Sequence, residues 1–385
     1  MSGRGGPSKA ITAVVLLALI AAFALYLGKQ RGRFESSMDT RDRRQRAVAA
    51  NNRALELSDQ REFAAAAQLL EQAYRDYPGD SAIVKNLAFA YGDLCVESLS
   101  RGRCPDARAY IAKALAVRDS EAALWYLKAE VCNRMNLSDS AQDAIVKAQA
   151  LGGMTPAVLE RLERLKHELA TQASFQSDYS GHFDIRFEGA ENRAFAEKAL
   201  IMLETIRDQA GRDLGWQVSG TTGVILYSDR QFADVTRLPA WTGAAFDGKI
   251  RMPMAGYRDD TTTLRAVLAH EFTHAVLFDM TGNRCPAWFS EGLAQLEQGR
   301  SPEPVYAPLD GLAGSFTTMS EDEAKQAYRA SLSAVSFLTR EHDMGFVRIM
   351  LEKIRNGQDF SAAFVATYDG TIAEFEERWK QSIAQ

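Results

Sequence analysis

The chain has 385 residues, 46% of them hydrophobic, and a formal net charge of −5 with acidic and basic residues well mixed. This composition excludes a disordered protein and supplies enough apolar material for two globular domains plus an N-terminal segment. The lack of a basic excess argues against a nucleic-acid partner.

The first candidate element is an uncharged apolar run at residues 10–27, AITAVVLLALIAAFALYL. At 1.5 Å per residue a helix of this length reaches about 27 Å, close to the thickness of the hydrocarbon core of a bilayer. We therefore expect an N-terminal transmembrane helix that anchors the protein, within a segment 1–33. A cleaved signal peptide is the alternative, because Ala22-Phe23-Ala24 fits a signal-peptidase site. The apolar run continues past that site, which favours the anchor.

The orientation of this anchor has two readings. Basic residues after the run outnumber those before it, which favours a cytoplasmic catalytic part by the positive-inside rule. They are Lys29, Arg31, Arg33, Arg41, Arg43 and Arg44. A signal-like N-terminus and an even number of cysteines fit an oxidising compartment instead, which we favour. The cysteines are Cys95, Cys104, Cys132 and Cys285.

Residues 34–46 are charged and lack apolar periodicity, so we expect a solvated linker or the polar start of a helix. A helix-turn-helix frame of about 34 residues follows, with small or apolar residues at matching positions of three units. The first unit has Ala54, Ala66, Leu70, Ala73 and Pro78; the second has Leu87, Ala88, Tyr91, Ala107, Ile111 and Ala114; the third has Trp125, Ala129, Ala141, Ile145 and Ala148.

These positions resemble tetratricopeptide repeats over residues 47–152. Small residues let paired helices approach at their crossing points, and stacked neighbours complete a core that one unit cannot make alone. A helix over 155–171 is expected to cap the array, which gives a repeat domain 47–172. A generic alanine-rich helical bundle is the alternative.

The middle unit fits the repeat frame if about seven residues are inserted between its two helices. The insertion falls around residues 98–103 and is flanked by Cys95 and Cys104. A disulfide could close across this loop. Two free, buried thiols are the alternative.

Two strand patterns follow the array. Phe183, Ile185 and Phe187 alternate with polar residues, which is the period of a half-buried strand, and residues 223–227 form a second apolar run. The stretch 194–210 between them has helical spacing. The chain after the array thus begins with strands.

A third strand is expected at 249–252. It ends at Pro253, which suits an edge position, where the strand could also pair with an extended peptide. An ordinary hairpin strand is the alternative. Since the chain beyond about residue 260 shows helices and loops, we expect an α+β domain, 178–385, with strands first and helices later.

The stretch 261–280 has the apolar spacing of a helix and carries HEFTH at residues 270–274, a complete HExxH motif. Residues four apart share a helix face, so His270 and His274 can offer two imidazole nitrogens to one Zn²⁺, with Glu271 placed as general base. Solvated polar residues on an exposed face are the alternative. The helix is strongly apolar, however, and desolvating three polar side chains needs the compensation that a metal supplies.

Glu291 is the expected third ligand. The positions of the metzincin glycine and third histidine are occupied by leucine and methionine, which excludes that pattern. Glu291 follows Pro286, which suits the first turn of a second helix packed against the motif helix, and Gly292 indicates a close approach between the two helices. Glu297 is the fallback ligand, and a plain surface carboxylate is the alternative role for Glu291.

The segments HEFTHAVL and PAWFSEGLA resemble the gluzincin metallopeptidases, in particular the bacterial peptidase MA-like family, whose members are often fused to tetratricopeptide repeats. The similarity covers residues 180–380, including 241–243 and 247–253. It implies a thermolysin-like zincin domain with a small sheet whose edge strand lies over the cleft, then the metal helix, then the helix with the third ligand. The three ligands and the base named above match the family's positions. The expected fold is therefore α+β, with a transmembrane helix, an all-α array and a zincin domain with a helical C-terminal part.

These features predict a membrane-tethered zinc metallopeptidase in a bacterial inner membrane, with its catalytic domain in the periplasm. Glu271 would take a proton from a zinc-activated water and pass it to the leaving amine. Tyr328 is the candidate donor to the developing oxyanion, and ring packing is its alternative role. The repeats are expected to recruit a peptide or protein substrate, or a protein partner. The rival hypothesis is a non-catalytic repeat scaffold with a structural or vestigial zinc domain.

Overall fold

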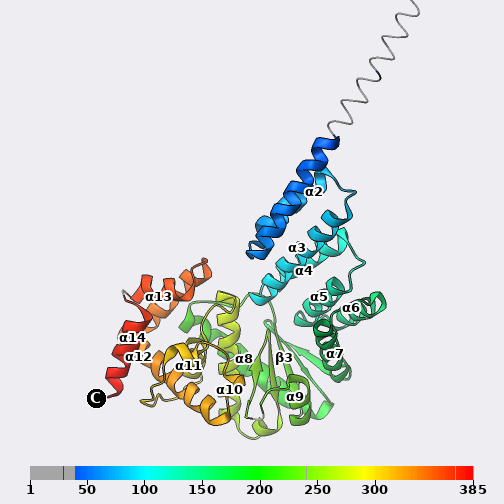
Figure 1. The fold of residues 1–385 in the computed structure, drawn as a ribbon. Coiled ribbons are helices and arrows are strands. Elements are labelled where there is room, and N and C mark those ends of the chain that lie inside the picture. Colours follow the sequence, from blue (N-terminus) through cyan, green and yellow to red (C-terminus); the bar gives the residue numbers. More distant parts are fainter. Residues whose placement is uncertain (1–28, 30–39, 240, 369, 385) are drawn as a thin grey trace, which may run out of the picture. The chain divides into compact units, whose positions relative to one another are not determined.

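The computed structural model describes residues 29, 40–239, 241–368 and 370–384 (Figure 1). The described chain divides into two compact units. One comprises the residues up to Asp93 together with Ala116–Arg118, and the other comprises Leu94–Leu115 and the chain from Asp119 onwards. Each unit has its own buried core.

The first unit is helical. Residues 40–59 form a helix, which is followed by α2 (Phe63–Asp76) and by the first part of α3 (Ser81–Ser100). The alanines of the repeat frame allow close packing, since they are fully buried: Ala47, Ala54, Ala66 and Ala73. The charged residues 40–46 are the polar start of a helix, one of the two expected alternatives.

The second unit begins with the rest of α3 and contains further helices. They are α4 (Cys104–Val117), α5 (Ala122–Arg134), α6 (Ser138–Leu151) and α7 (Pro156–Thr171). Thr155 caps α7 by accepting a hydrogen bond from the backbone N–H of Val158 at 3.4 Å. Small residues of α5 and α6 and leucines of α7 share one core. The cap helix expected at 155–171 is thus confirmed to within one residue.

The insertion expected as a loop around residues 98–103 is helix as far as Ser100, and only the three residues after it form a turn. α3 has 20 residues, whereas α4 and α6 have 14 each, so the additional residues lengthen α3 as far as Ser100. Cys95 and Cys104 are free thiols. Of the two alternatives, the structure supports free thiols, of which Cys95 is buried and Cys104 is partly buried.

A five-stranded mixed sheet follows, in the order β1-β2-β3-β5-β4. The strands are β1 (Gln176–Tyr179), β2 (Phe183–Phe187), β3 (Thr222–Tyr227), β4 (Ala245–Phe246) and β5 (Lys249–Pro253). The three central strands are parallel, and β1 and β4 run antiparallel at the two edges. Parallel neighbours require crossover connections, which here contain α8 (Arg193–Leu214) and α9 (Asp229–Thr236).

The prediction that residues 249–252 form an edge strand is wrong. β5 pairs with β3 on one side and with β4 on the other, where Ala245 lies opposite Arg251 and Phe246 opposite Ile250. β4 and β5 form an ordinary antiparallel hairpin, which was the stated alternative. Since β4 already occupies that side of β5, an added peptide strand cannot pair there, and the edge of the sheet is β4.

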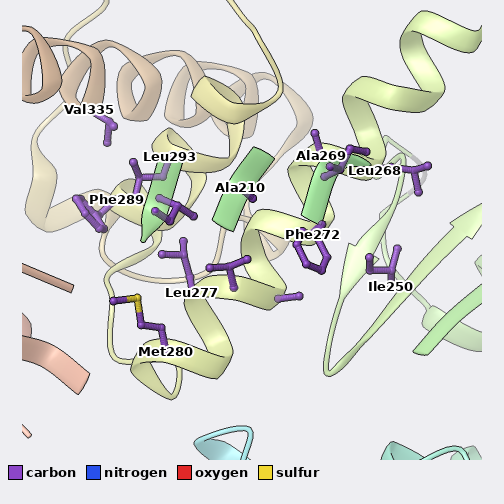
Figure 2. Packing of buried hydrophobic residues seen from close by; sticks show 14 of the residues in the cluster. Ala210, Ile250, Leu268, Ala269, Phe272, Leu277, Met280, Phe289, Leu293 and Val335 are labelled. Atoms are coloured by element: carbon purple, nitrogen blue, oxygen red, sulfur yellow. The ribbon is translucent and has the colours of Figure 1, made fainter. Parts of the chain in front are cut away.

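One face of the sheet is apolar and packs against α8 and α10 (Thr261–Thr281). Side chains alternate along a strand, which sends Phe183 and Ile250 to this face. Phe183 meets Phe272 of α10 edge-on, with ring centroids 5.4 Å apart. Figure 2 shows Ile250 and Phe272 in the same core as Leu268. This core fixes the position of α10 on the sheet.

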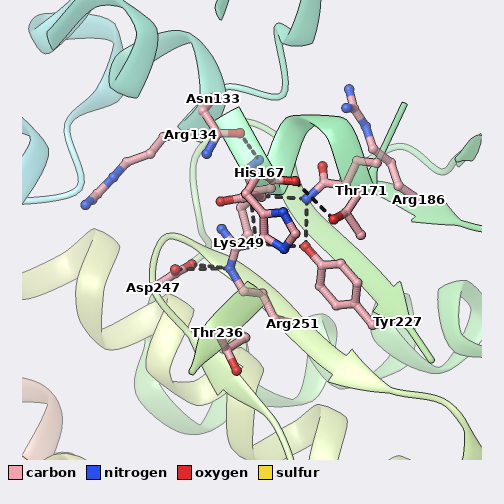
Figure 3. A network of polar contacts seen from close by, with 12 residues as sticks. Asn133, Arg134, His167, Thr171, Arg186, Tyr227, Thr236, Asp247, Lys249 and Arg251 are labelled. Atoms are coloured by element: carbon pink, nitrogen blue, oxygen red, sulfur yellow. Dashed lines mark hydrogen bonds and ion pairs between the residues drawn. The ribbon is translucent and has the colours of Figure 1, made fainter. Parts of the chain in front are cut away.

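The opposite face of the sheet is charged and meets α5 and α7 (Figure 3). Arg251 of β5 donates hydrogen bonds to Glu168 of α7 at 2.8 Å and to the hydroxyl of Tyr227 at 3.1 Å. Lys249, which is 1% exposed, donates to Oδ1 of Asn133 on α5 at 3.1 Å. These five residues are called the sheet–array network below. They join the sheet to helices of the array through buried polar contacts.

The C-terminal part is helical. Its elements after α10 are α11 (Ala287–Glu297), α12 (Glu321–Arg355), α13 (Phe360–Tyr368) and α14 (Ile372–Ile383). α11 packs closely on α12, because a Cβ atom on Gly292 would lie 2.4 Å from the backbone oxygen of Ser331. The close approach at Gly292 is therefore to α12, whereas the sequence suggested the metal helix.

The predicted fold class is also wrong in its balance of helices and strands, and none of the described helices supplies the expected membrane span. Helices make up 71% of the structure, and the small sheet alternates with helices instead of preceding them. In the described part of the chain, no helix is both long enough and apolar enough to cross a bilayer. The described helices therefore give no support to the expected single-pass anchor, nor to the inner-membrane and periplasmic placement that followed from it. Residues 10–27 lie outside the described residues.

Candidate metal centre

Helix α10 has well-defined ends. The carboxylate of Asp260 caps its first turn by accepting a hydrogen bond from the backbone N–H of Thr263 at 2.9 Å. At the other end Gly282 adopts φ 62, the left-handed conformation that commonly terminates helices. The HExxH motif therefore lies in the middle of a continuous helix.

The two histidines of the motif lie on one face of α10, because residues four apart in a helix stand one above the other. The Nε2 atoms of His270 and His274 are 3.2 Å apart. On the remainder of the helix surface, Leu268, Phe272 and Val276 are fully buried in the core. Packing thus turns the two imidazoles away from the sheet and towards α11.

Helix α11 brings Glu291 to the two imidazoles. Its Oε2 atom lies 3.2 Å from Nε2 of His270 and 3.4 Å from Nε2 of His274. The side chains are 15%, 17% and 19% exposed for His270, His274 and Glu291, respectively. The three expected ligands therefore come together in a half-buried site that is still accessible to a small ion.

The outer nitrogens of both imidazoles are also held by α11 and its C-cap. Nδ1 of His270 lies 3.2 Å from Oε1 of Gln298, and Nδ1 of His274 lies 3.0 Å from the hydroxyl of Ser290. An amide oxygen can only accept, so His270 carries its proton on Nδ1 and directs the lone pair of Nε2 into the site. Such outer contacts fix the tautomer and the ring orientation of metal-binding histidines.

The site fits a metal ion. One ligand atom from each of His270, His274 and Glu291 can be chosen so that all three lie within 4.8 Å of one another. Oε2 of Glu291 is buried and lacks a hydrogen-bond donor in the structure. Buried electron-pair donors that converge in this way are unfavourable unless a cation or a proton joins them. The triad could therefore bind a metal ion.

The charges of the triad shift its pKa values. Burial acts to raise the pKa of Glu291, but His274 and His270 outweigh it and hold that pKa well below its usual range. Burial acts to lower the pKa of His274, and Glu291 reverses this and raises it to about 9. Without a metal, the pair is therefore held as an ion pair.

Glu271 lies beside the triad without belonging to it. Its side chain is turned inwards, and the residue is 6% exposed. Burial raises the pKa of Glu271, an effect that His270 and His274 oppose and Glu291 reinforces. A carboxylate with a raised pKa that is not itself a ligand is suited to accept and release protons.

A pocket of about 780 Å³ opens over His270 and Glu271. The segment 241–244, which leads into the edge strand β4, forms part of its wall. Tyr328 of α12 lines the pocket as well, and its ring packs edge-on against Trp241 with centroids 6.4 Å apart. The hydroxyl of Tyr328 makes no hydrogen bond within the described residues. Burial raises the pKa of Tyr328 well above its usual range, as do Glu291 and Glu271.

No protein-family model matches this chain, and no match was found among curated proteins. The resemblance to gluzincin peptidases and to tetratricopeptide repeats thus rests on the motifs alone.

Glu297, the fallback ligand, lies apart from the triad. Its carboxyl group interacts with that of Asp213 at the end of α8; burial and this second acid together raise the pKa of Glu297 to about 7. Six residues separate Glu297 from Glu291, which sets their side chains on different faces of α11. The choice of Glu291 over Glu297 is therefore consistent with the geometry.

Three residues of the site were not predicted from the sequence. Ser290 precedes the ligand Glu291, and Gln298 follows it by seven residues, which is about two helical turns and hence the same face. That spacing could have suggested Gln298. Tyr257 also lines the pocket and donates its hydroxyl hydrogen to the backbone oxygen of Gly243 at 3.0 Å. No local pattern in the sequence marks Tyr257, because its position depends on the fold.

Proposed function

We propose that this protein is a zinc-dependent metallopeptidase that hydrolyses peptide bonds. The observation that carries the proposal is the convergence of three electron-pair donors within 4.8 Å beside Glu271, a buried carboxylate outside the triad. A purely structural metal site has no need of such a neighbour. The pocket is lined by His270 of the triad and by Glu271, so a substrate bound there would lie against both.

The donor set favours zinc. Two imidazole nitrogens and one carboxylate oxygen are the ligands of many catalytic zinc sites, whereas magnesium and calcium prefer oxygen ligands throughout. Three protein ligands also leave one position open for a reactant, as catalytic sites require. His270, His274 and Glu291 would hold one Zn²⁺.

When bound, the zinc ion supplies a Lewis acid that polarises a carbonyl group and lowers the pKa of water towards about 7. Glu271 then acts as general base, taking a proton from the attacking water and passing it to the nitrogen of the leaving amine. Its burial supports this role, because a carboxylate with a raised pKa both accepts and returns a proton readily near neutral pH.

Tyr328 is the proposed donor to the oxyanion that develops on the scissile carbonyl. Its hydroxyl hydrogen is uncommitted within the described residues, and its raised pKa keeps the hydroxyl protonated. Packing of the ring between Trp241 and Phe316, whose centroid is 5.2 Å away, would hold the hydroxyl in place for this role. The packing role expected as the alternative is therefore compatible with donation.

The helix pairs before the sheet are proposed to recruit a protein substrate or partner. Stacked helix pairs offer an extended surface that suits protein ligands. The sheet–array network supports this proposal, because it holds α5 and α7 on the sheet through buried contacts. A ligand bound by those helices would be held close to the domain that carries the metal centre.

The proposal is tested with purified wild type and Glu271→Gln, by metal analysis and by cleavage of a peptide library. We expect one zinc per chain in both proteins, and a loss of turnover by about 10² to 10⁴ in the variant. Glu297→Gln is the matched control, because it changes a half-buried glutamate of the same helix that lies outside the triad. A wild type that cleaves no more peptides than zinc-loaded Glu271→Gln does would instead favour a non-catalytic scaffold.

A further inference from the structure

The wall of the pocket away from the metal centre is charged. Six charged side chains line it: Arg300, Glu303, Glu321, Asp322, Lys325 and Arg329. Most of them neutralise one another, since Lys325 pairs with Glu321 at 2.7 Å and Arg329 pairs with Glu303. Asp322 adds its negative charge to the surroundings of Lys325.

Arg300 is the exception. Within the described residues it has no carboxylate partner, although it lines the same pocket as His270 and Glu271. Its charge acts on Tyr328, whose pKa it lowers while Glu291 and Glu271 raise it. A guanidinium without a close ion-pair partner therefore lies within electrostatic range of the proposed oxyanion donor.

The backbone around Arg300 is fixed to the metal centre. Helix α11 ends in a Schellman turn, in which Gly299 adopts φ 83. The N–H of Gly299 donates to the oxygen of Leu296 at 2.9 Å, and the N–H of Arg300 donates to the oxygen of Gln295 at 3.1 Å. Gln298, the residue before this glycine, holds His270. Arg300 is therefore the next residue after the turn, and Gln298 of the same turn orients the proposed metal ligand His270.

A guanidinium group is well suited to bind a carboxylate, because its planar fork donates two parallel hydrogen bonds to the two oxygens. We infer that Arg300 binds a carboxylate of the substrate and makes the enzyme prefer peptides with a negative charge near the scissile bond. This inference rests on the proposed peptidase function. The carboxylate could be the C-terminus of a short peptide or the side chain of an aspartate or glutamate, and the two sources are separable.

Four matched peptides separate them. They share one cleavable core and differ in having a C-terminal acid or amide and a glutamate or glutamine beside the scissile bond. We expect the wild type to cleave the preferred charged peptide about tenfold better in kcat/KM than its neutral counterpart, the effect of one charge-assisted contact. The favoured pair of peptides identifies the source of the carboxylate.

The variant Arg300→Gln should lose this preference, and Arg300→Lys should recover part of it. Lys325→Gln is the matched control, because it removes a basic side chain of the same wall that already has an acidic partner. Its preference should equal that of the wild type. Zinc content and thermal unfolding of each variant check that the fold and the metal centre are intact.

Binding to zinc-loaded Glu271→Gln, followed by fluorescence anisotropy of the four labelled peptides, tests Arg300 without turnover. If no peptide is ever cleaved but the Kd ratio of charged to neutral peptide depends on Arg300, the inference holds and the peptidase proposal fails. The role of Arg300 would be overturned if all four peptides were cleaved and bound equally, or if none of them bound. A preference that survives in Arg300→Gln would overturn it as well.

Discussion

The metal centre and the sheet–array network both bury polar side chains, but the two regions differ in whether those side chains find hydrogen-bond or charge partners within the protein. In the network each cation faces an acceptor: Arg251 bonds to Glu168 and Tyr227, and Lys249 bonds to Asn133. In the metal centre two imidazole nitrogens and a carboxylate oxygen converge on one point, where only a proton or a cation can join them. The first arrangement is complete in the protein itself. The second can exchange a proton for a metal ion, and it is therefore where we place the chemistry.

Some atoms next to the network also lack hydrogen-bond partners, among them Oδ1 of Asp184 and Nε of Arg186. Each belongs to a group that is bonded through its other atoms. Asp184 accepts from Asn136 through Oδ2 at 2.8 Å, and Arg186 donates to the hydroxyl of Ser138 at 2.6 Å. An unsatisfied atom is thus a weaker sign of a ligand site than several donors that converge on one point.

Removal of the metal should produce the largest effect. A chelator is expected to reduce peptide hydrolysis to background and to lower the unfolding temperature, because an ion that binds the folded state alone stabilises it by mass action. Added zinc should restore both. The measurement is hydrolysis and thermal unfolding before chelation, after it and after zinc is returned. Full activity in chelator would contradict a metal-dependent mechanism.

Loss of one cation from the network should affect stability and leave the metal centre intact. In Arg251→Met the carboxylate of Glu168, which is 12% exposed, loses its charged partner, which costs about 3–5 kcal/mol of unfolding free energy. Urea denaturation measures this cost.

The control for Arg251 is Arg193→Met, which removes an ion pair with Asp178 whose side chains are 47% and 28% exposed. Its cost should stay below about 1 kcal/mol. Zinc content should be unchanged in both variants. Equal stability losses in the two would show that burial does not distinguish these pairs.

Tyr328→Phe separates packing from donation. The ring and its contacts remain, so stability and zinc content should match the wild type, while kcat should fall by about 10² with KM nearly unchanged. Steady-state kinetics on one cleaved peptide decides this. An unchanged kcat would assign Tyr328 to packing alone.

The smallest expected effect is a pH dependence at Lys249. Burial lowers its pKa from 10.5 to about 8, so the unfolded chain binds more protons than the folded one between those values. Stability contributed by this residue therefore rises with pH across that window. Relative to Lys249→Met, the wild type should gain on the order of 2 kcal/mol from pH 8 to pH 10.5. Urea denaturation of both proteins across this range would detect it, and a constant difference would contradict it.

Local patterns in the sequence predicted the elements that carry the site. The HExxH spacing requires a helix face, and the alternation of Phe183, Ile185 and Phe187 requires a strand, so both could be recognised without tertiary information. Glu291 could be chosen because Pro286 marked the start of a second helix and Gly292 indicated a close approach to a neighbouring helix. The local elements that carry the site therefore followed from short-range periodicity, whereas their arrangement did not.

Features that depend on distant neighbours could not be predicted. β4 has two residues, too few for any pattern, and its pairing removed β5 from the edge of the sheet. Lys249 and Arg251 have the alternation of a solvent-facing strand side, yet helices of the array bury them. Gly292 showed that something approaches closely, but the sequence could not show that this is α12. Ser290 and Gln298 matter because of the histidines that they contact.

Zinc titration of the metal-free wild type, Glu291→Gln and Glu297→Gln tests the metal centre most directly. We predict that the wild type and Glu297→Gln bind one zinc per chain with equal affinity, and that Glu291→Gln binds it at least about 100-fold more weakly. Equal zinc affinity in Glu291→Gln and the wild type, or no zinc bound by the wild type, would contradict the assignment of His270, His274 and Glu291 as the ligands.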